Sequence, residues 1–215
     1  MRQPRFRTVL FDWDGTLLDS YHADSQAYLY MFRVLGISWG LEELERHYSP
    51  NWHNIYRAVG LPKERWAEAD QLWRAGYREH RTVLQRGANQ VLHRLAAKYQ
   101  LGLVTSGSTV RVRRQVHAFG FERLFAAQVF GDEVPRRKPH PAAIWLALSR
   151  LGAAPQSAVY VGDAPEDVMM ARRAGVMAVG VTGHSPVPER LRRSRPDALI
   201  DRITALPSLL AKLGG

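Results

Sequence analysis

The sequence predicts an α/β fold in which a parallel sheet carries an inserted all-helical segment. The chain opens on a short apolar run, residues 8–11, which is typical of a buried strand. Residues 20–81 then show apolar side chains at helical spacing and no convincing strand. From residue 101 onward apolar runs alternate with helical patterns, and such alternation builds parallel sheets through right-handed crossovers. We therefore expect two domains, a core of residues 1–17 and 84–215 and a helical cap of residues 18–83.

The inserted segment contains two clear helical patterns. Apolar residues recur at helical spacing from Tyr21 to Leu35, and Gly36 can end that helix. The pattern returns from Lys63 to His80. We interpret the aromatic side chains of these helices as the core of the insert. Because the insert directly follows the first strand, it must rise from the edge of the sheet where that strand ends, and it can act as a lid there.

The remainder of the chain is expected to complete the sheet and to cover it with helices. Short apolar runs bounded by turn-forming residues indicate the strands, and apolar residues at a spacing of three and four indicate the helices. The expected strands are 101–105, 127–130, 158–161, 178–181 and 198–200, and the expected helices are 109–119, 141–151, 165–174 and 203–212.

Two carboxylates follow the first strand and are the strongest indication of function. Asp12 and Asp14 share a face of an extended segment, and Gly15 allows the backbone to turn. Ligands of open α/β sheets bind at this edge. Acids so close together repel each other unless a cation lies between them or one is protonated, and either state suits catalysis. An acidic turn is the alternative, whereas an EF-hand loop is excluded because it needs acids at Thr16 and Ala23.

Composition excludes several classes of function. The 215 residues include no cysteine, so disulfides, thiolate metal sites and cysteine nucleophiles are excluded. No apolar run approaches the roughly 18 residues of a membrane span. The N-terminus lacks the apolar stretch of a signal peptide. We therefore expect a cytoplasmic protein without a membrane partner.

The net charge of +10 predicts a surface that attracts anions. Most of the basic residues are arginines, and they gather in residues 111–114, 136–138 and 190–195. No helix-turn-helix, zinc-finger or RNP pattern accompanies these groups, so nucleic acid is not the expected partner. We interpret the groups as solvated helix faces.

Two later segments place polar side chains after expected strands. Thr105 and Ser106 offer hydroxyl and backbone N–H groups in front of a helix, an arrangement that suits an oxyanion. Ser108 could also simply cap that helix. Lys138 lies in a loop stiffened by two prolines. A fixed ammonium near paired carboxylates would neutralise their charge and bind a phosphoryl oxygen.

A third segment, residues 161–168, reads VGDAPEDV and again joins a strand to a helix through carboxylates. Asp163 and Glu166 are spaced as a capping box, which is the simpler interpretation of this pair but does not account for Asp167. Asp12 and Asp163 can converge across adjacent strand ends, and hard carboxylate oxygens are what Mg²⁺ requires. The histidines show no metal-binding spacing, and no Walker-type glycine loop is present.

Taken in order, these segments resemble the four motifs of the haloacid dehalogenase superfamily. They are DWDGT at residues 12–16, Val104-Thr105, Lys138-Pro139 and VGDAPEDVMMARRAGV at residues 161–176. The helical insert resembles the small cap of the phosphoglycolate phosphatase and β-phosphoglucomutase-like branch. The resemblance spans nearly the whole chain and implies a Rossmann-like core with an all-helical cap.

The resemblance implies a Mg²⁺-dependent phosphatase that acts on a small phosphate monoester, such as a phosphoglycolate-like compound, a sugar phosphate or a nucleotide. By this resemblance Asp12 would attack phosphorus to form an aspartyl phosphate. Asp14 would protonate the leaving oxygen and then activate water. Thr105, the N–H of Ser106 and Lys138 would hold the transferring group.

Mg²⁺ would be bound by Asp12, the backbone carbonyl of Asp14 and Asp163, with Asp167 acting indirectly. The dehalogenase and phosphonatase patterns lack an acid at the second motif position, so Asp14 favours transfer from oxygen. Sugar phosphomutases typically place a hinge histidine ten residues after the second acid, where this chain has Asp24.

A mutase, a pyrophosphatase and a non-catalytic anion- or nucleic-acid-binding protein on this fold remain the alternatives. Fold alone does not determine the substrate. We expect contacts with the leaving group from the irregular stretch Ser49–His53 between two cap helices and from the turn after it, with Trp52, His53 and Arg57 as candidates.

Overall fold

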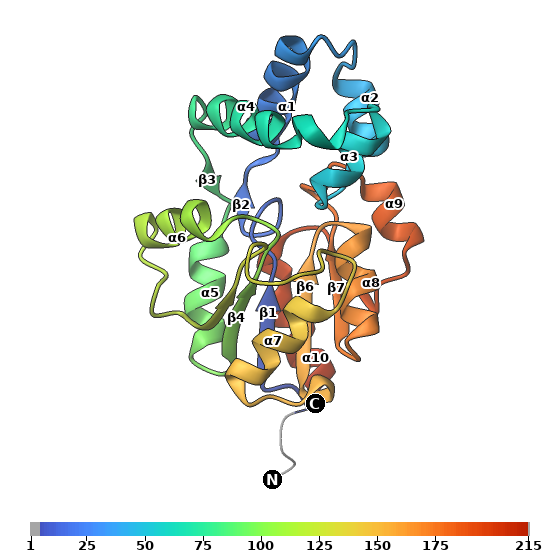
Figure 1. The fold of residues 1–215 in the computed structure, drawn as a ribbon. Coiled ribbons are helices and arrows are strands. Elements are labelled where there is room, and N and C mark those ends of the chain that lie inside the picture. Colours follow the sequence, from blue (N-terminus) through green and yellow to red (C-terminus); the bar gives the residue numbers. More distant parts are fainter. Residues whose placement is uncertain (1–4, 215) are drawn as a thin grey trace.

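The computed structural model describes residues 5–214, which form a sheet core below and a helical lobe above (Figure 1). The sheet has six parallel strands in the order β5-β4-β1-β6-β7-β8. This arrangement confirms the predicted α/β class. The strands are β1 (Thr8–Phe11), β4 (Gln100–Val104), β5 (Phe125–Val129), β6 (Ala158–Gly162), β7 (Met177–Val181) and β8 (Ala198–Ile200).

Helices cover both faces of the sheet because successive strand residues point to opposite sides. Val9 and Phe11 belong to one buried cluster with α5, α6 and α10, whereas Leu10 belongs to a second cluster with α7, α8 and α9. The strands are therefore mostly apolar, as expected for a sheet buried on both faces. The helices are α5 (Ala88–Ala96), α6 (Thr109–Ala118), α7 (Ala142–Leu151), α8 (Pro165–Arg173), α9 (Pro188–Arg193) and α10 (Leu206–Gly214).

The helical lobe lies over the carboxyl ends of the strands (Figure 1). It consists of α1 (Tyr21–Leu35), α2 (Leu41–His47), α3 (Trp52–Ala58) and α4 (Trp66–Arg78), with a 3₁₀ turn at Lys63–Arg65. These helices share a hydrophobic cluster of their own that includes Tyr28, Phe32 and Ile55. Gly36 ends α1 in the left-handed conformation, as the sequence predicted. We call this lobe the cap.

Several short elements differ from the expectation. A two-stranded antiparallel sheet, β2 (Leu18–Asp19) and β3 (Val83–Leu84), joins the cap to the core, and strands of two residues leave no periodic signal. Trp52 and His53, expected in an irregular stretch, form the first turn of α3. The expected domain boundaries at 18 and 83 fall within β2 and β3, and the division into two domains stays a prediction.

Helices α5 and α9 lie in stretches to which no helix was assigned, and the last expected helix begins as a 3₁₀ turn at Ile203–Ala205. A further 3₁₀ turn covers Pro155–Ser157. Among residues 5–214, none of the helices combines the length and apolar character needed to cross a bilayer.

Gly15 turns the chain out of β1 in a place where no side chain fits. Its φ is +78°, and a Cβ built there would lie 2.3 Å from Oδ2 of Asp163. The Gly15 N–H donates to the carbonyl of Leu18, closing the turn toward the cap. The close approach of the β1 and β6 ends therefore depends on a glycine at this position.

We predict that Gly15→Ala destabilises the fold more than Gly36→Ala. Both glycines have a positive φ, and this strain alone costs about 1–2 kcal/mol for alanine. At Gly36 nothing lies within 4 Å of a new Cβ, whereas at Gly15 the Asp163 carboxylate must move. Urea titration should therefore show a larger loss of unfolding free energy for Gly15→Ala. Equal losses would contradict the proposed close approach.

Candidate active site

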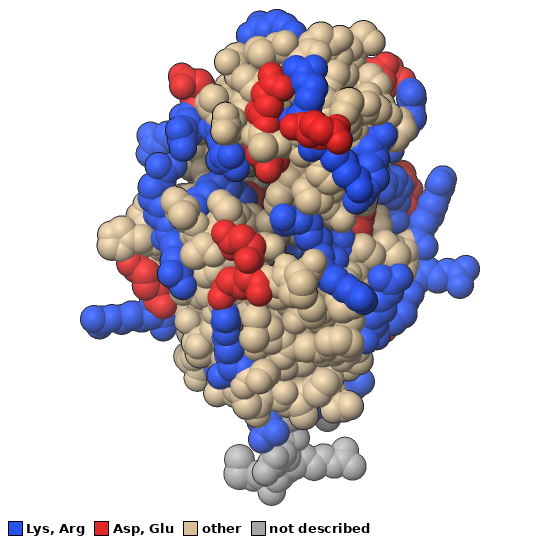
Figure 2. All heavy atoms as spheres, viewed as in Figure 1, with Lys and Arg blue, Asp and Glu red and all other residues tan. Residues whose placement is uncertain are grey.

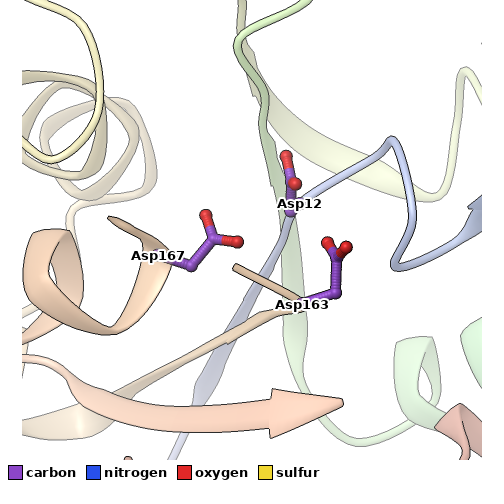
Figure 3. Close-up of side chains that lie close together, drawn as sticks. All are labelled: Asp12, Asp163 and Asp167. Atoms are coloured by element: carbon purple, nitrogen blue, oxygen red, sulfur yellow. The ribbon is translucent and has the colours of Figure 1, made fainter. Parts of the chain in front are cut away.

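Three buried aspartates meet at the carboxyl edge of the sheet (Figure 3). Asp12 follows β1, Asp163 follows β6 and Asp167 lies in the first turn of α8. Each offers a carboxylate oxygen, and these atoms all lie within 4.8 Å of one another. The expected convergence of Asp12 and Asp163 is thus what the structure shows, because β1 and β6 are adjacent parallel strands.

Lys138 balances part of this negative charge. Its Nζ lies 2.7 Å from Oδ1 of Asp12 and 2.7 Å from Oδ1 of Asp167, and all three side chains are buried. It comes from the loop between β5 and α7, as the sequence placed it. Asp167 also accepts hydrogen bonds from the Tyr160 hydroxyl and the Ala164 N–H, each at 3.1 Å. Asp167 is therefore held toward Lys138 by the core itself.

The capping-box interpretation of Asp163 and Glu166 is wrong. Ala164 is the N-cap of α8, and the carboxylate that accepts from its N–H belongs to Asp167. Glu166 instead accepts from the hydroxyl of Ser49 in the cap, at 2.9 Å. The helix begins at Pro165, one residue later than a cap at Asp163 would require, so Asp163 has no capping role.

The buried cluster contains more negative than positive charge. Burial raises the pKa of Asp12 to about 7, although Lys138 opposes this shift. Burial and the charge of Asp12 raise the pKa of Asp163 well above its usual value. Three carboxylates face one ammonium, and uncompensated buried charge is costly. A donor set made only of hard carboxylate oxygens with this excess charge fits a divalent cation such as Mg²⁺.

Asp14 forms a bidentate ion pair with an arginine that the sequence interpretation missed. Arg111 of α6 donates from Nη1 to Oδ1 of Asp14 at 2.9 Å and from Nη2 to Oδ2 at 2.6 Å. Burial raises the pKa of Asp14, but the charge of Arg111 and these two bonds outweigh it, so the net shift is downward. The expectation that Arg111 lies on a solvated helix face is wrong, since only 15% of its side chain is exposed.

The segment after β4 supplies hydroxyls to the same site. Thr105 is buried, and its Oγ1 accepts from the N–H of Gly107 at 3.0 Å. The Ser106 hydroxyl is buried with no hydrogen-bond partner within residues 5–214. Ser108 is the N-cap of α6 by position but makes no capping bond through its side chain, and the N–H of Thr109, the first residue of the helix, donates to Asp132.

A cavity lies between this edge of the sheet and the cap. Its floor includes Asp12, Asp14, Thr105, Ser106 and Asp163. Its cap side is rich in aromatic side chains, namely Tyr28, Tyr48, Trp52, Tyr56, Trp73 and Tyr77. The interpretation of the cap aromatics as core alone was therefore incomplete, since several of them pack inside the cap and also line the cavity.

The three cap candidates are placed differently from one another. Trp52 lines the cavity. The His53 ring instead stacks on Trp66, with centroids 4.5 Å apart. The Arg57 guanidinium lies 5.4 Å from the same ring and donates to Asn54. His53 and Arg57 are not among the residues that line the cavity, so the structure does not bring them together with Trp52 at this site.

Core side chains fasten the cap loop between α2 and α3 over the site. Besides the Ser49–Glu166 bond, Arg190 donates to the carbonyl of Tyr48 at 2.9 Å. The Arg137 guanidinium lies 3.8 Å from the centre of the Trp52 ring. Two more residues of the arginine groups thus have specific structural roles. Figure 2 shows basic side chains spread over both lobes rather than gathered in one patch, so no nucleic-acid surface stands out on this face.

The chain is similar to known phosphatases along its whole length. Residues 9–181 match the model of the haloacid dehalogenase-like hydrolase family. A phosphoglycolate phosphatase from Nitrosococcus oceani is 30% identical over 99% of this chain and 99% of its own length. The pyrophosphatase PpaX of Bacillus pumilus is 27% identical over 98% of this chain and 99% of its own length.

Solved structures share the fold. A haloacid dehalogenase-like family hydrolase from Streptococcus pneumoniae superposes with a TM-score of 0.82 at 24% identity, covering 95% of this chain and 98% of its own. A hydrolase from Pseudomonas syringae gives a TM-score of 0.86 at 22% identity, covering 97% of this chain and 100% of its own. The arrangement of helices and strands therefore belongs to a fold that these chains share.

Asp24 is an unexpected acid in the cavity wall. It lies in α1, and its Oδ1 accepts from Nε1 of Trp73 at 3.1 Å. Burial raises the pKa of Asp24 from 3.8 to about 7, and the nearby charge of Asp14 adds to the shift. Asp24 therefore holds its proton more tightly in the folded protein than in the unfolded chain.

We predict that Asp24→Asn stabilises the protein above pH 7 and has a smaller effect near pH 4. Because the folded-state pKa is raised, the wild type loses unfolding free energy as pH rises from 3.8 through about 7, and asparagine avoids this loss. Urea titrations of both proteins between pH 4 and pH 8 measure the difference. A pH-independent difference would contradict the assigned ionisation.

Proposed function

Because the chain belongs to the haloacid dehalogenase-like hydrolase family, we propose that it is a Mg²⁺-dependent phosphatase that hydrolyses a small phosphate monoester through an aspartyl phosphate. One observation carries the proposal: Asp12 sits in a buried cluster with Lys138 and Asp163, and a second acid, Asp14, lies two residues away at the same cavity. The similarity to enzymes named phosphoglycolate phosphatase and pyrophosphatase supports a small phosphorylated substrate.

In this proposal Asp12 attacks phosphorus, and the intermediate divides one difficult displacement into two steps. Lys138 orients the Asp12 carboxylate and balances charge on the phosphoryl oxygens. Thr105 and Ser106 line the same cavity as Asp12, which supports donation to those oxygens from the Thr105 hydroxyl and the N–H of Ser106. Asp14 protonates the leaving oxygen and later takes a proton from the attacking water.

Asp12, Asp163 and the backbone carbonyl of Asp14 would hold Mg²⁺. When bound, the ion would neutralise charge on the phosphoryl group and the nucleophile. Asp167 is committed to Lys138, Tyr160 and the Ala164 N–H, which supports an indirect role for it. The carboxylate of Asp163 accepts from the Thr16 hydroxyl at 2.9 Å, and this bond fixes its direction.

One residue of the cap favours a phosphatase over a mutase. It occupies the position at which sugar phosphomutases typically carry a histidine. That residue is Asp24, and it is bound to Trp73. Pyrophosphate hydrolysis is the second candidate, because the PpaX relative is similar over nearly the full length. A non-catalytic anion-binding protein would have no use for a second acid beside a buried nucleophile. The cytoplasmic location expected from the sequence stays a prediction.

We predict that wild-type protein releases inorganic phosphate from a panel of phosphate monoesters and pyrophosphate when Mg²⁺ is present. Chelator should abolish the release. Asp12→Asn should lower the rate by at least about 10³-fold, because the nucleophile is lost. Asp201→Asn, which changes an exposed acid, is the matched control and should keep full activity. Retained turnover in Asp12→Asn would refute the assigned nucleophile.

A binding measurement tests the metal site without turnover. Mg²⁺ should raise the melting temperature of the wild type and of Asp201→Asn, since an ion that binds only the folded state stabilises it. Asp163→Asn should lose most of this increase because it removes a ligand and one negative charge. If Mg²⁺ raised the melting temperature of Asp163→Asn as much as that of the wild type, the ion would have to bind elsewhere.

A further inference from the structure

Arg111 joins the proposed acid to the cap. Arg111 is paired with Asp14, and its Nη1 also lies 3.3 Å from the Tyr77 hydroxyl and 3.2 Å from Oε1 of Gln115. The guanidinium lies 5.1 Å from the centre of the Tyr77 ring and 6.0 Å from that of Trp73, both on cap helix α4. Its place in the cavity wall is therefore set by the core and the cap together.

The ion pair between Arg111 and Asp14 conflicts with the role proposed for Asp14. Arg111 donates to both carboxylate oxygens of Asp14, so neither oxygen can turn freely toward a leaving group. A bidentate pair of this kind is among the stronger charged contacts in proteins. It is only partly buried, with 15% of Arg111 and 27% of Asp14 exposed. Asp14 can act on the leaving oxygen only if another group takes over part of the guanidinium.

Among the cavity-lining residues, two are cationic, Arg74 and Arg111. Lys138 is already committed to Asp12 and Asp167. Arg74 is exposed, and no hydrogen bond or ion pair joins it to Asp14 within the described residues, whereas Arg111 holds both oxygens of the proposed acid. The other acid near Arg111 is Asp24, and burial raises its pKa to about 7, which weakens its competition for the guanidinium near neutral pH.

We propose that Arg111 determines specificity by exchanging Asp14 for an anionic group on the leaving part of the substrate. The inference rests on the proposed function. A carboxylate or a second phosphate matches the planar, two-pronged guanidinium that now holds Asp14. Once Arg111 binds that group, Asp14 is released to serve the leaving oxygen. The substrates that this selects are small phosphate esters or anhydrides that carry a second anion.

The exchange adds no reactant to the proposed reaction. A bond forms between phosphorus and an Asp12 oxygen while the bond from phosphorus to the leaving oxygen breaks. Asp14 takes up a proton from solvent once Arg111 has left it, and the leaving oxygen keeps the electron pair and takes that proton. Water later restores the carboxylate of Asp12 and supplies the proton that Asp14 regains. Arg111 only exchanges one anionic partner for another. With a neutral leaving group Arg111 would stay paired with Asp14.

The test compares phosphoglycolate with its carboxamide, which keeps the shape and removes the second charge. In the wild type kcat/KM should be much higher for the carboxylate. Arg111→Gln should lower kcat/KM for phosphoglycolate by roughly 10–100-fold, the equivalent of one charged hydrogen-bonded contact. For the carboxamide kcat/KM should not fall, because this substrate offers Arg111 no anion and the variant no longer holds Asp14. Arg114→Gln, an exposed arginine on the same helix, is the control.

Arg111→Lys should recover part of the preference, because it keeps the charge but not the fork. Equal losses on both substrates would overturn the proposal and leave Arg111 with a structural role. Release of p-nitrophenolate from p-nitrophenyl phosphate by the wild type checks the proposed function separately, since this leaving group carries no second anion and needs no proton from Asp14.

Binding to Asp12→Asn gives a readout that does not need turnover. By titration calorimetry this variant should bind phosphoglycolate more tightly than the carboxamide. Adding Arg111→Gln should remove the difference. If the preference survives in the double variant, or is absent before Arg111 is changed, the proposal fails even where phosphatase activity is present.

Discussion

The contact between Lys138 and the carboxylates of Asp12 and Asp167 is the interaction on which the rest of the site depends. Each of these three groups would be costly to bury alone, and together they still leave Asp163 without a counter-charge. The sheet brings them together because β1 and β6 are parallel neighbours whose carboxyl ends share an edge. The same excess of negative charge that destabilises the fold favours a divalent cation at this place, and the bound cation would in turn attract an anionic phosphoryl group.

The cap is held over that edge by contacts from the same segments that carry the proposed site residues. Glu166 follows Asp163 by three residues and accepts from Ser49, and Arg137 precedes Lys138 and covers the Trp52 ring. The loops that supply the proposed chemistry therefore also fasten the roof of the cavity. A change in the position of the cap would be felt directly at α8 and at the loop that carries Lys138.

The parallel sheet and the main residues at its edge could be predicted from the sequence, because apolar strands and carboxylates at strand ends are local signals. The places of Asp12, Lys138 and Asp163 follow from a parallel sheet whose strand ends meet. Arg111 could not be found in this way. Its partners Asp14 and Tyr77 lie 97 and 34 residues away, and α6 carries other arginines at nearby positions. Only the packing of the cap on the core decides which of them faces the cavity.

The ion pair between Arg111 and Asp14 also changes how the motif at residues 12–16 should be understood. The resemblance assigns Asp14 its role from its position two residues after Asp12, as if the acid were ready for use. In the folded chain its carboxylate is neutralised by an arginine from another element, and the cap contacts that arginine. Whether Asp14 can serve a leaving group therefore depends on what else enters the cavity. Residues outside the motifs thus decide when the motif can act.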